Sequence, residues 1–382
     1  MAHQFPRSWS DPDIELLRDN AARFLDAEVE PHDEEARRRG DVGRAIWRRA
    51  GELGLLCTDI PEQWGGGGGD FRHEAVIDEE LHRRGLTGLC SPVHSIVAHY
   101  VLNHGTPAQK ERYLPRLARG ELIGAIAMTE PGAGSDLQAL RARAERRGAS
   151  YVLNGSKTFI SNGLLAGLVL VVCKTDPGQR ARGTSILMVE TEGCAGYRVG
   201  RVLDKIGMKA QDTSELFFDD VVVPEENLLG GVEGQGFIQL MSDLPYERLI
   251  IAVTALAAME GAYEATLDYV RERRVFGTPL IELQNTRFKL AEVATSIAVG
   301  RAFVDRCIEQ RVAGTLDTAT ASMAKLWSTE TQGKVIDELL QMYGGYGYMN
   351  EYMIARMYTD ARVQRIFGGT SEIMKEVIAR AL

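Results

Sequence analysis

The chain has 382 residues, of which 45% are hydrophobic and 25% are charged. These proportions are ordinary for a globular enzyme, and the length favours two or three domains. A net charge of −9 argues against nucleic acid as the main partner, although a few local arginines can still bind an anionic ligand.

The cysteines and the N-terminus indicate the compartment. The five cysteines are scattered without a C-x-x-C pair, so we expect neither a disulfide framework nor a zinc site. The first residues lack a basic start, an apolar stretch and a small-residue cleavage site, so no signal peptide is expected. No apolar run reaches the roughly 18 residues that span a bilayer. We therefore expect a cytoplasmic protein without a membrane partner.

Residues 1–120 have the pattern of a helical domain. Apolar residues from Ile14 to Val29 recur at three- and four-residue steps, and Pro31 is expected to end this helix. A second helix is expected from Val42 to Leu53. Consecutive glycines at 65–69 predict a turn, after which helices resume and continue to the end of the domain.

Residues 121–230 predict a β domain. Short apolar or alternating runs are separated by Gly, Asn, Asp and Pro, which is typical of a small barrel or sandwich. The runs are Leu122–Met128, Tyr151–Leu153, Leu168–Val172, Ile186–Val189 and Leu216–Val223.

Residues 231–382 return to helical patterns with short connections, which predicts a helical bundle. Four helices are expected at 237–274, 282–313, 318–343 and 371–380. Pro245 is expected either to kink the first of them or to mark a fresh start.

Two segments of the middle domain have residues suited to a ligand. Thr129–Asp136 reads TEPGAGSD, and its small residues let backbone N–H groups approach a phosphate or a ring edge, although the segment also fits a plain turn. Lys157–Gly163 reads KTFISNG, which fits strand alternation or an aromatic contact by Phe159 with a hydrogen bond from Ser161. The chain has no G-x-G-x-x-G fingerprint, so a nucleotide site has to be built in another way.

Three segments of the C-terminal domain are each ordinary when taken alone. Arg273 at a helix end fits dipole compensation, and Gln341 before a glycine pair fits a helix stop. Thr370 and Ser371 follow a tight glycine turn and are good N-cap residues. Such a helix start can also receive a phosphate or a ring oxygen.

Taken together, these motifs resemble the acyl-CoA dehydrogenase family over nearly the whole chain. The ordered matches are TEPGAGSD, KTFISNG, ERRVFG, QMYGGYGY and GGTSEI. The resemblance implies an α+β multidomain fold with a helical N-terminal domain (1–120), a β-barrel middle domain (121–230) and a C-terminal four-helix bundle (231–382). It also implies bound FAD and a homo-oligomer, expected to be a homotetramer. The segments 319–325 and 360–364 are most similar to the long-chain branch.

The resemblance also assigns cofactor-binding residues. In the middle domain, Ile160 lies in the segment expected to contact the flavin, and Phe159 should face the ring system. Ser161 should donate to flavin N5, and Ser135 should also lie near the CoA portion of the substrate. The full expected set is Met128, Thr129, Ser135, Phe159, Ile160, Ser161, Thr370 and Glu372 from one subunit, with Arg273, Phe276, Gln284, Gln341, Gly344 and Gly345 holding the FAD of a neighbouring subunit.

One departure from the family pattern decides the expected catalytic base. Many relatives carry a catalytic glutamate at the position of Gly368, which has no side chain to accept a proton. A second branch, which includes isovaleryl-CoA and long-chain acyl-CoA dehydrogenases, places the base early in a C-terminal helix, where this chain has Glu247. A glutamate in the first turn of a helix is also common for dipole reasons alone.

The mechanism implied by the resemblance is removal of the α-proton by Glu247 and transfer of the β-hydride to flavin N5. The backbone N–H of Gly368 and a flavin hydroxyl should bind the thioester oxygen. Burial is expected to raise the pKa of Glu247. Tyr246, Arg248 and Gly369 are expected to contact the acyl-CoA substrate, and an electron-transfer flavoprotein is the expected electron acceptor.

Three alternatives remain open. Biosynthetic relatives act on acyl groups held by carrier proteins, and the sequence hardly discriminates this case. Flavin monooxygenases and nitroalkane oxidases share the fold, but Glu247 together with Gly368 argues against both. A non-catalytic binding module is disfavoured because the base and the flavin motifs are intact.

Overall fold

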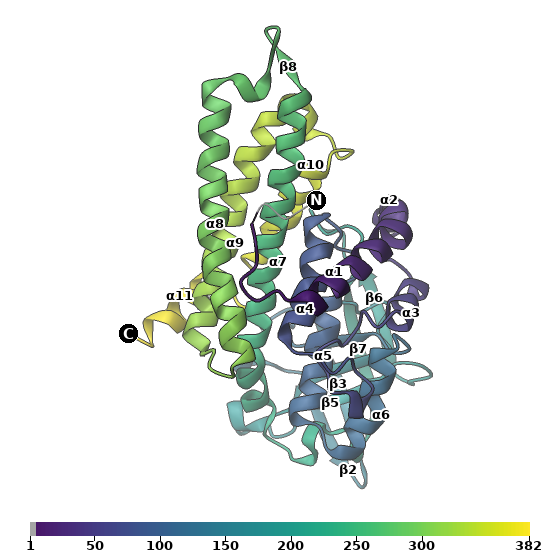
Figure 1. The fold of residues 1–382 in the computed structure, drawn as a ribbon. Coiled ribbons are helices and arrows are strands. Elements are labelled where there is room, and N and C mark those ends of the chain that lie inside the picture. The colour runs from purple at the N-terminus through teal and green to yellow at the C-terminus, as the bar shows by residue number, and fades with distance from the viewer. Residues whose placement is uncertain (1–4) are drawn as a thin grey trace.

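The computed structural model describes residues 5–382 and shows three regions in the order helical, β and helical (Figure 1). Long helices of the C-terminal region stand side by side, and the N-terminal helices and the sheet lie against one half of their length. The N-terminal helices are α1 Pro12–Phe24, α2 Asp33–Arg39, α3 Arg44–Glu52, α4 Phe71–Arg83, α5 Ser91–His104 and α6 Pro107–Ala118.

The N-terminal region differs from the prediction at one point. Pro31 does not end the helical path, because a π turn at Leu25–Val29 and a 3-10 turn at Glu30–His32 lead directly into α2. Proline is tolerated there since the first turn of a helix needs no N–H from it. The glycine turn at 65–69 is confirmed, and a Cβ on Gly66 would lie 2.3 Å from the carbonyl oxygen of Ile60.

The middle region is a seven-stranded sheet. Its ladder runs β1-β4-β2-β3-β7-β6, with β5 paired to β4, and within residues 5–382 it does not return from β6 to β1. The sheet encloses its own apolar core, as the predicted β middle domain requires. The strands are β1 Gly124–Ala127, β2 Arg143–Arg147, β3 Ser150–Ser161, β4 Leu168–Lys174, β5 Thr184–Glu190, β6 Tyr197–Val202 and β7 Thr213–Pro224.

Strands β2 and β6 were not predicted because their sequences carry little apolar alternation. Strand β2 reads RAERR and buries only Ala144, whereas β6 reads YRVGRV and has no fully buried residue. Both are held by pairing with longer neighbours, β3 and β7, so their strand conformation depends on tertiary contacts.

The C-terminal region contains α7 Gly236–Glu272, α8 Gln284–Val312, α9 Thr318–Tyr343, α10 Met353–Gln364 and α11 Ser371–Ala379, with a short hairpin of β8 Arg274–Val275 and β9 Thr278–Pro279. Helix α10 was not predicted, and it packs against α7 and α9 as the fourth helix of the bundle. The helix predicted for that place, α11, lies at the outer end of the bundle (Figure 1).

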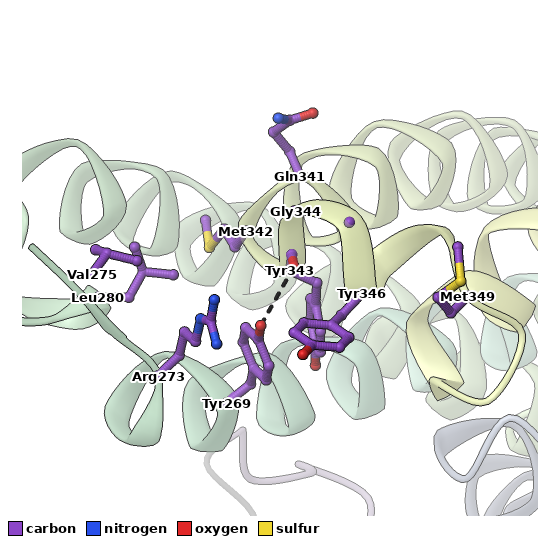
Figure 2. Close-up of a pocket in the computed structure, with 11 residues that line it drawn as sticks. Tyr269, Arg273, Val275, Leu280, Gln341, Met342, Tyr343, Gly344, Tyr346 and Met349 are labelled. Atoms are coloured by element: carbon purple, nitrogen blue, oxygen red, sulfur yellow. Dashed lines mark hydrogen bonds between the residues drawn. The ribbon is translucent and has the colours of Figure 1, made fainter.

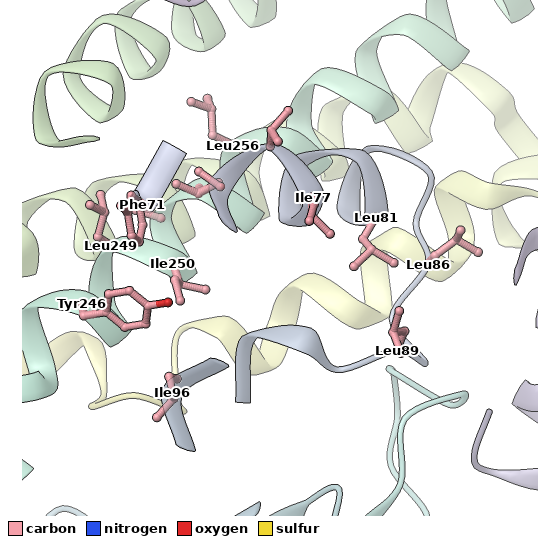
Figure 3. Close-up of a cluster of buried hydrophobic side chains, with 14 of the residues drawn as sticks. Phe71, Ile77, Leu81, Leu86, Leu89, Ile96, Tyr246, Leu249, Ile250 and Leu256 are labelled. Atoms are coloured by element: carbon pink, nitrogen blue, oxygen red, sulfur yellow. The ribbon is translucent and has the colours of Figure 1, made fainter. Parts of the chain in front are cut away.

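Helix α7 is 37 residues long and continues through Pro245 without a break. It is long and apolar enough to cross a membrane by length and composition, but 83% of its most apolar window is buried within the fold. Figure 3 shows why: Phe71 and Ile77 of α4 and Ile96 of α5 surround Tyr246 and Ile250 of α7. This burial is typical of a core helix.

Buried ion pairs join the N-terminal segment to the bundle. Arg301 of α8 donates to Glu79 of α4 at 2.6 Å, to Glu260 of α7 at 2.6 Å and to Asp305 at 3.1 Å. Arg7 donates to Glu79 at 2.8 Å and to Glu260 at 2.7 Å. Each of these charged side chains is at most 5% exposed, so the network fixes the N-terminal helices against α7.

We predict that Arg301→Met lowers the free energy of unfolding by about 3 kcal/mol, because it leaves buried carboxylates short of a positive partner. Urea unfolding followed by tryptophan fluorescence measures the change. Arg306→Met, on the same helix but exposed, is the matched control and should cost less than about 0.5 kcal/mol. Equal losses in the two variants would contradict the assigned role of the network.

Candidate active site

The buried carboxyl of Glu247 is the centre of the candidate site. It lies on α7 with 6% of its surface exposed, and its Oε1 accepts a hydrogen bond of 2.9 Å from the hydroxyl of Tyr100 on α5. Within residues 5–382, Oε2 has no hydrogen-bond partner. Burial raises the pKa of Glu247 to about 7, against a lowering by the Tyr100 bond. The group is therefore poised to exchange a proton near neutral pH.

Gly368 lies beside the same face of α7. Glu247 and Ile251 are four residues apart and so share a helix face. A Cβ on Gly368 would lie 2.4 Å from Cδ1 of Ile251, and the backbone there has a φ of +61°. The N–H of Gly368 donates to no acceptor within the described residues. The place that a side chain at position 368 would take is therefore next to Ile251, one helical turn along α7 from Glu247.

The turn at Gly368 and Gly369 is held by a lysine of α9 that the sequence reasoning missed. Lys325 is buried, its ammonium donates to the carbonyl oxygen of Gly369, and its Cε would lie 3.5 Å from a Cβ on Gly368. Burial and the nearby Arg248 lower the pKa of Lys325 to about 8. The only sequence signal was a lysine in a run of small residues, ATASMAK.

Arg248 and Tyr246 point into different surroundings. Arg248 donates from Nη1 to the hydroxyl of Ser322 at 2.9 Å, and its buried Nε has no partner within residues 5–382. Tyr246 is 1% exposed, donates to Asp59 at 3.3 Å and stacks on His99. The structure thus places the Tyr246 side chain in the core, and its predicted contact with substrate stays a prediction.

The predicted flavin contacts of the middle domain surround the end of β3. Phe159 is 67% exposed with a φ of +60°, so its ring is held outward by an unfavourable backbone conformation. Ser161 ends the strand and is half-buried, whereas the side chain of Ile160 is buried in the sheet core and leaves only its backbone available. An exposed aromatic ring on a strained backbone fits the face of a flat cofactor.

The backbone of Met128 and Thr129, which directly follows β1, is held in place by a buried lysine. Lys157 donates to the carbonyl oxygen of Met128 at 2.9 Å and to Glu130 at 2.9 Å. Thr129 is half-buried and its carbonyl oxygen accepts from the N–H of Thr158. This ladder holds the Met128 and Thr129 backbone next to Phe159. Ser135 is exposed in the following loop.

A second set of predicted residues lies at the far end of α7. Arg273, Gln341, Gly344 and Gly345 line a cavity of about 440 Å³ together with Tyr269 and other residues. Figure 2 shows Tyr269 bonded to the carbonyl oxygen of Tyr343, with Gln341 extending away from Arg273. The structure thus brings these four predicted residues together.

The remaining predicted residues lie at the ends of elements, where all but the half-buried Thr370 are exposed. Phe276 projects from the tip of the β8–β9 hairpin with 101% of its surface exposed, and Gln284 opens α8. Thr370 caps α11 by accepting from the N–H of Ile373, and Glu372 lies exposed in the first turn of that helix.

The two predicted sets of cofactor residues are far apart in one chain. Glu247 and Arg273 are separated along α7 by about 39 Å at the helical rise of 1.5 Å per residue. The Gly368 turn lies against the Glu247 end, and the cavity lies at the Arg273 end. One bound molecule beside Glu247 therefore cannot also fill the distal cavity of the same chain, so both sets serve one cofactor only if two chains contribute.

Family models match three consecutive parts of the chain. The acyl-CoA dehydrogenase N-terminal domain matches residues 11–121, the middle domain matches 125–221 and the C-terminal domain matches 234–382.

Individual relatives agree with these matches. The mitochondrial long-chain specific acyl-CoA dehydrogenase of Mus musculus is 49% identical over 371 residues, which cover 96% of this chain and 86% of the mouse protein. The crystal structure of an acyl-CoA dehydrogenase from Geobacillus kaustophilus has a TM-score of 0.95 at 45% identity, covering 98% of this chain and 99% of that chain. A glutaryl-CoA dehydrogenase from Mycobacterium smegmatis in complex with FADH2 has a TM-score of 0.89 at 27% identity, covering 97% and 95%. The predicted family and fold class are confirmed: the chain belongs to the acyl-CoA dehydrogenase family of oxidoreductases, which act on CH–CH bonds.

Proposed function

We propose that this protein catalyses FAD-dependent α,β-dehydrogenation of an acyl-CoA thioester, with Glu247 as the base. The observation that carries the proposal is the buried carboxyl of Glu247, in which one oxygen accepts a hydrogen bond and the other does not. One helical turn along α7, Ile251 contacts the turn at Gly368, whose N–H has no acceptor in the described chain. A base needs a pKa near the working pH, and burial supplies this by raising the pKa of Glu247 to about 7.

Glu247 and the residues around it have separate proposed roles toward the substrate. Oε2 of Glu247 takes the α-proton of the acyl group. The N–H of Gly368 donates to the thioester oxygen, where negative charge develops as that proton leaves. Lys325 holds the Gly369 carbonyl and so keeps this N–H in place. The unpartnered Nε of Arg248 supplies a further donor for the substrate or the surrounding turn.

Bound FAD would supply the acceptor for the hydride that leaves the β-carbon. Phe159, Ser161, Met128 and Thr129 would hold its ring system, and the exposed, strained ring of Phe159 supports this fit. Arg273, Gln341, Gly344 and Gly345 would hold the distal part of a neighbouring subunit's FAD. The separation of about 39 Å along α7 supports at least a dimer, and a homotetramer is the expectation from the family.

Similarity to relatives supports a proposal for the substrate class and the pathway. The 49% identity with the mouse long-chain enzyme favours a long-chain acyl-CoA and a role in fatty-acid β-oxidation. We propose an electron-transfer flavoprotein as the electron acceptor. The cytoplasmic location stays a prediction, and the mouse relative is mitochondrial.

We predict that Glu247→Gln lowers the rate of flavin reduction by acyl-CoA by roughly 10²–10⁴-fold, because the amide cannot accept the α-proton. The variant should still bind FAD, since Glu247 is not among the cofactor residues. Stopped-flow bleaching of the holoenzyme measures the rate, and the visible spectrum measures cofactor content. Glu292→Gln, an exposed glutamate on α8, is the control. A Glu247→Gln rate close to that of the parent would rule out this base.

We predict that anaerobic titration of the yellow holoenzyme with a panel of acyl-CoAs bleaches the flavin, most rapidly with long-chain members. The similarity to long-chain relatives motivates this order. Bleaching by carrier-protein thioesters but by no acyl-CoA would instead favour the carrier-bound substrate. Retained colour with every thioester would contradict the dehydrogenation itself.

We predict that Gly368→Ala costs about 2–4 kcal/mol of stability and slows flavin reduction, because its Cβ meets Ile251 at 2.4 Å and its φ is +61°. Gly314→Ala is the matched control: its φ is +69° but no atom lies within 4 Å of its Cβ, so it isolates the backbone strain. Adding Ile251→Val removes the clashing Cδ1 and should recover part of the loss in thermal unfolding. No recovery would show that the contact with Ile251 does not limit this position.

A further inference from the structure

Tyr100 lies in contact with the proposed base, and no predicted role uses it. It sits on α5 with 0% of its surface exposed, and its hydroxyl donates to Oε1 of Glu247 at 2.9 Å. The two residues are 147 positions apart in the chain, so the bond forms only when the N-terminal helices pack on α7. Within residues 5–382, Glu247 is the only hydrogen-bond acceptor of this hydroxyl.

We propose that Tyr100 is a positioning residue for the dehydrogenation, which fixes the rotamer of Glu247 and sets the pH range in which it accepts a proton. This inference rests on the proposed role of Glu247. The bond occupies Oε1 and leaves Oε2 without a hydrogen bond in the described chain, so Oε2 is the oxygen that can accept a proton. A carboxylate anchored at one oxygen keeps the other within the narrow geometry that proton transfer requires.

The chemistry of the bond gives it a second effect. A phenol donates more strongly to a carboxylate than to a carboxylic acid, so it favours the ionised base. Burial alone pushes the pKa of Glu247 upward, and the hydrogen bond from Tyr100 opposes this rise. Burial and the neighbouring carboxylates keep the pKa of Tyr100 well above its usual range, so the phenol stays protonated and remains a donor.

The other charged groups near Glu247 do not replace Tyr100. Asp243, one turn earlier on α7, raises the pKa of Glu247, but His104 and Asn103 of α5 are bonded to it. Arg248 on α7 lowers the pKa of Glu247 less than the Tyr100 hydrogen bond does, and its own hydrogen bond goes to Ser322. Lys325 of α9 is directed to Gly369. Tyr100 is therefore the one group in the described chain that hydrogen-bonds the carboxyl itself.

The test is Tyr100→Phe in the holoenzyme, which keeps the ring and removes the hydroxyl. Flavin reduction by a saturating acyl-CoA is measured by stopped flow across the pH range on both sides of neutrality. We expect the acid limb of the rate profile to move up by about one pH unit, giving a loss of about five-fold at pH 7 that largely recovers at alkaline pH. The substrate concentration for half-maximal rate should change little.

Tyr113→Phe is the matched control, because Tyr113 is a fully buried tyrosine of α6 that bonds Glu190 and Asn227 instead. Its profile should not move. A Tyr100→Phe profile that is unshifted, or lowered equally at every pH, would overturn the inference by leaving only a packing role. Infrared titration of the carboxylic acid band that is lost in Glu247→Gln gives an independent readout, and this band should titrate at higher pH in Tyr100→Phe.

The two proposals fail in different ways. If Glu247→Gln retains the parent rate, the assignment of the base is wrong and Tyr100 has nothing to position. If Glu247→Gln abolishes flavin reduction while Tyr100→Phe leaves the acid limb and the infrared titration unchanged, the base stands and the inference about Tyr100 fails.

Discussion

The burial of α7 on nearly every side is the constraint from which the rest of the molecule follows. Helix α4 and α5 cover one side of it, and α8, α9 and α10 cover the others, so the N-terminal domain completes the C-terminal core. A helix this enclosed offers a low-dielectric environment to any polar group on it. For Glu247 the raised pKa corresponds to roughly 3 kcal/mol in favour of the neutral acid, from 4.5 to about 7. The same packing that stabilises the core therefore raises the pKa of this carboxyl toward neutral pH.

The elements that could be predicted from the sequence are those set by the local pattern of apolar residues and by local composition. Helices α7, α8 and α9 were found because long segments with apolar positions need no partner to be recognised, and the glycine turn followed from composition. Strands β2 and β6 were missed because pairing alone makes them strands. The short helix α10 lies within the 344–370 stretch between two glycine-rich turns, where no helical pattern was recognised.

The candidate site divides in the same way. Glu247 could be proposed from the sequence because the family resemblance points to it and Gly368 has no side chain at the alternative position. Tyr100 and Lys325 could not be identified, because their roles depend on which helices pack against α7. Tyr246 shows how helical geometry separates neighbours in sequence: it directly precedes Glu247, the proposed base, but its ring lies in the core beside His99. The predicted contact of Tyr246 with the substrate stays a prediction.

The contact between Ile251 and the Gly368 turn has a consequence for how the family could diversify. Moving the base from α7 to the turn would require a glutamate at 368, but its Cβ would meet Ile251 on a left-handed backbone. A shorter residue at 251 would relieve this contact, so the side chain at 251 and the side chain that position 368 can carry are coupled. Two positions 117 residues apart in the sequence therefore constrain each other across the turn.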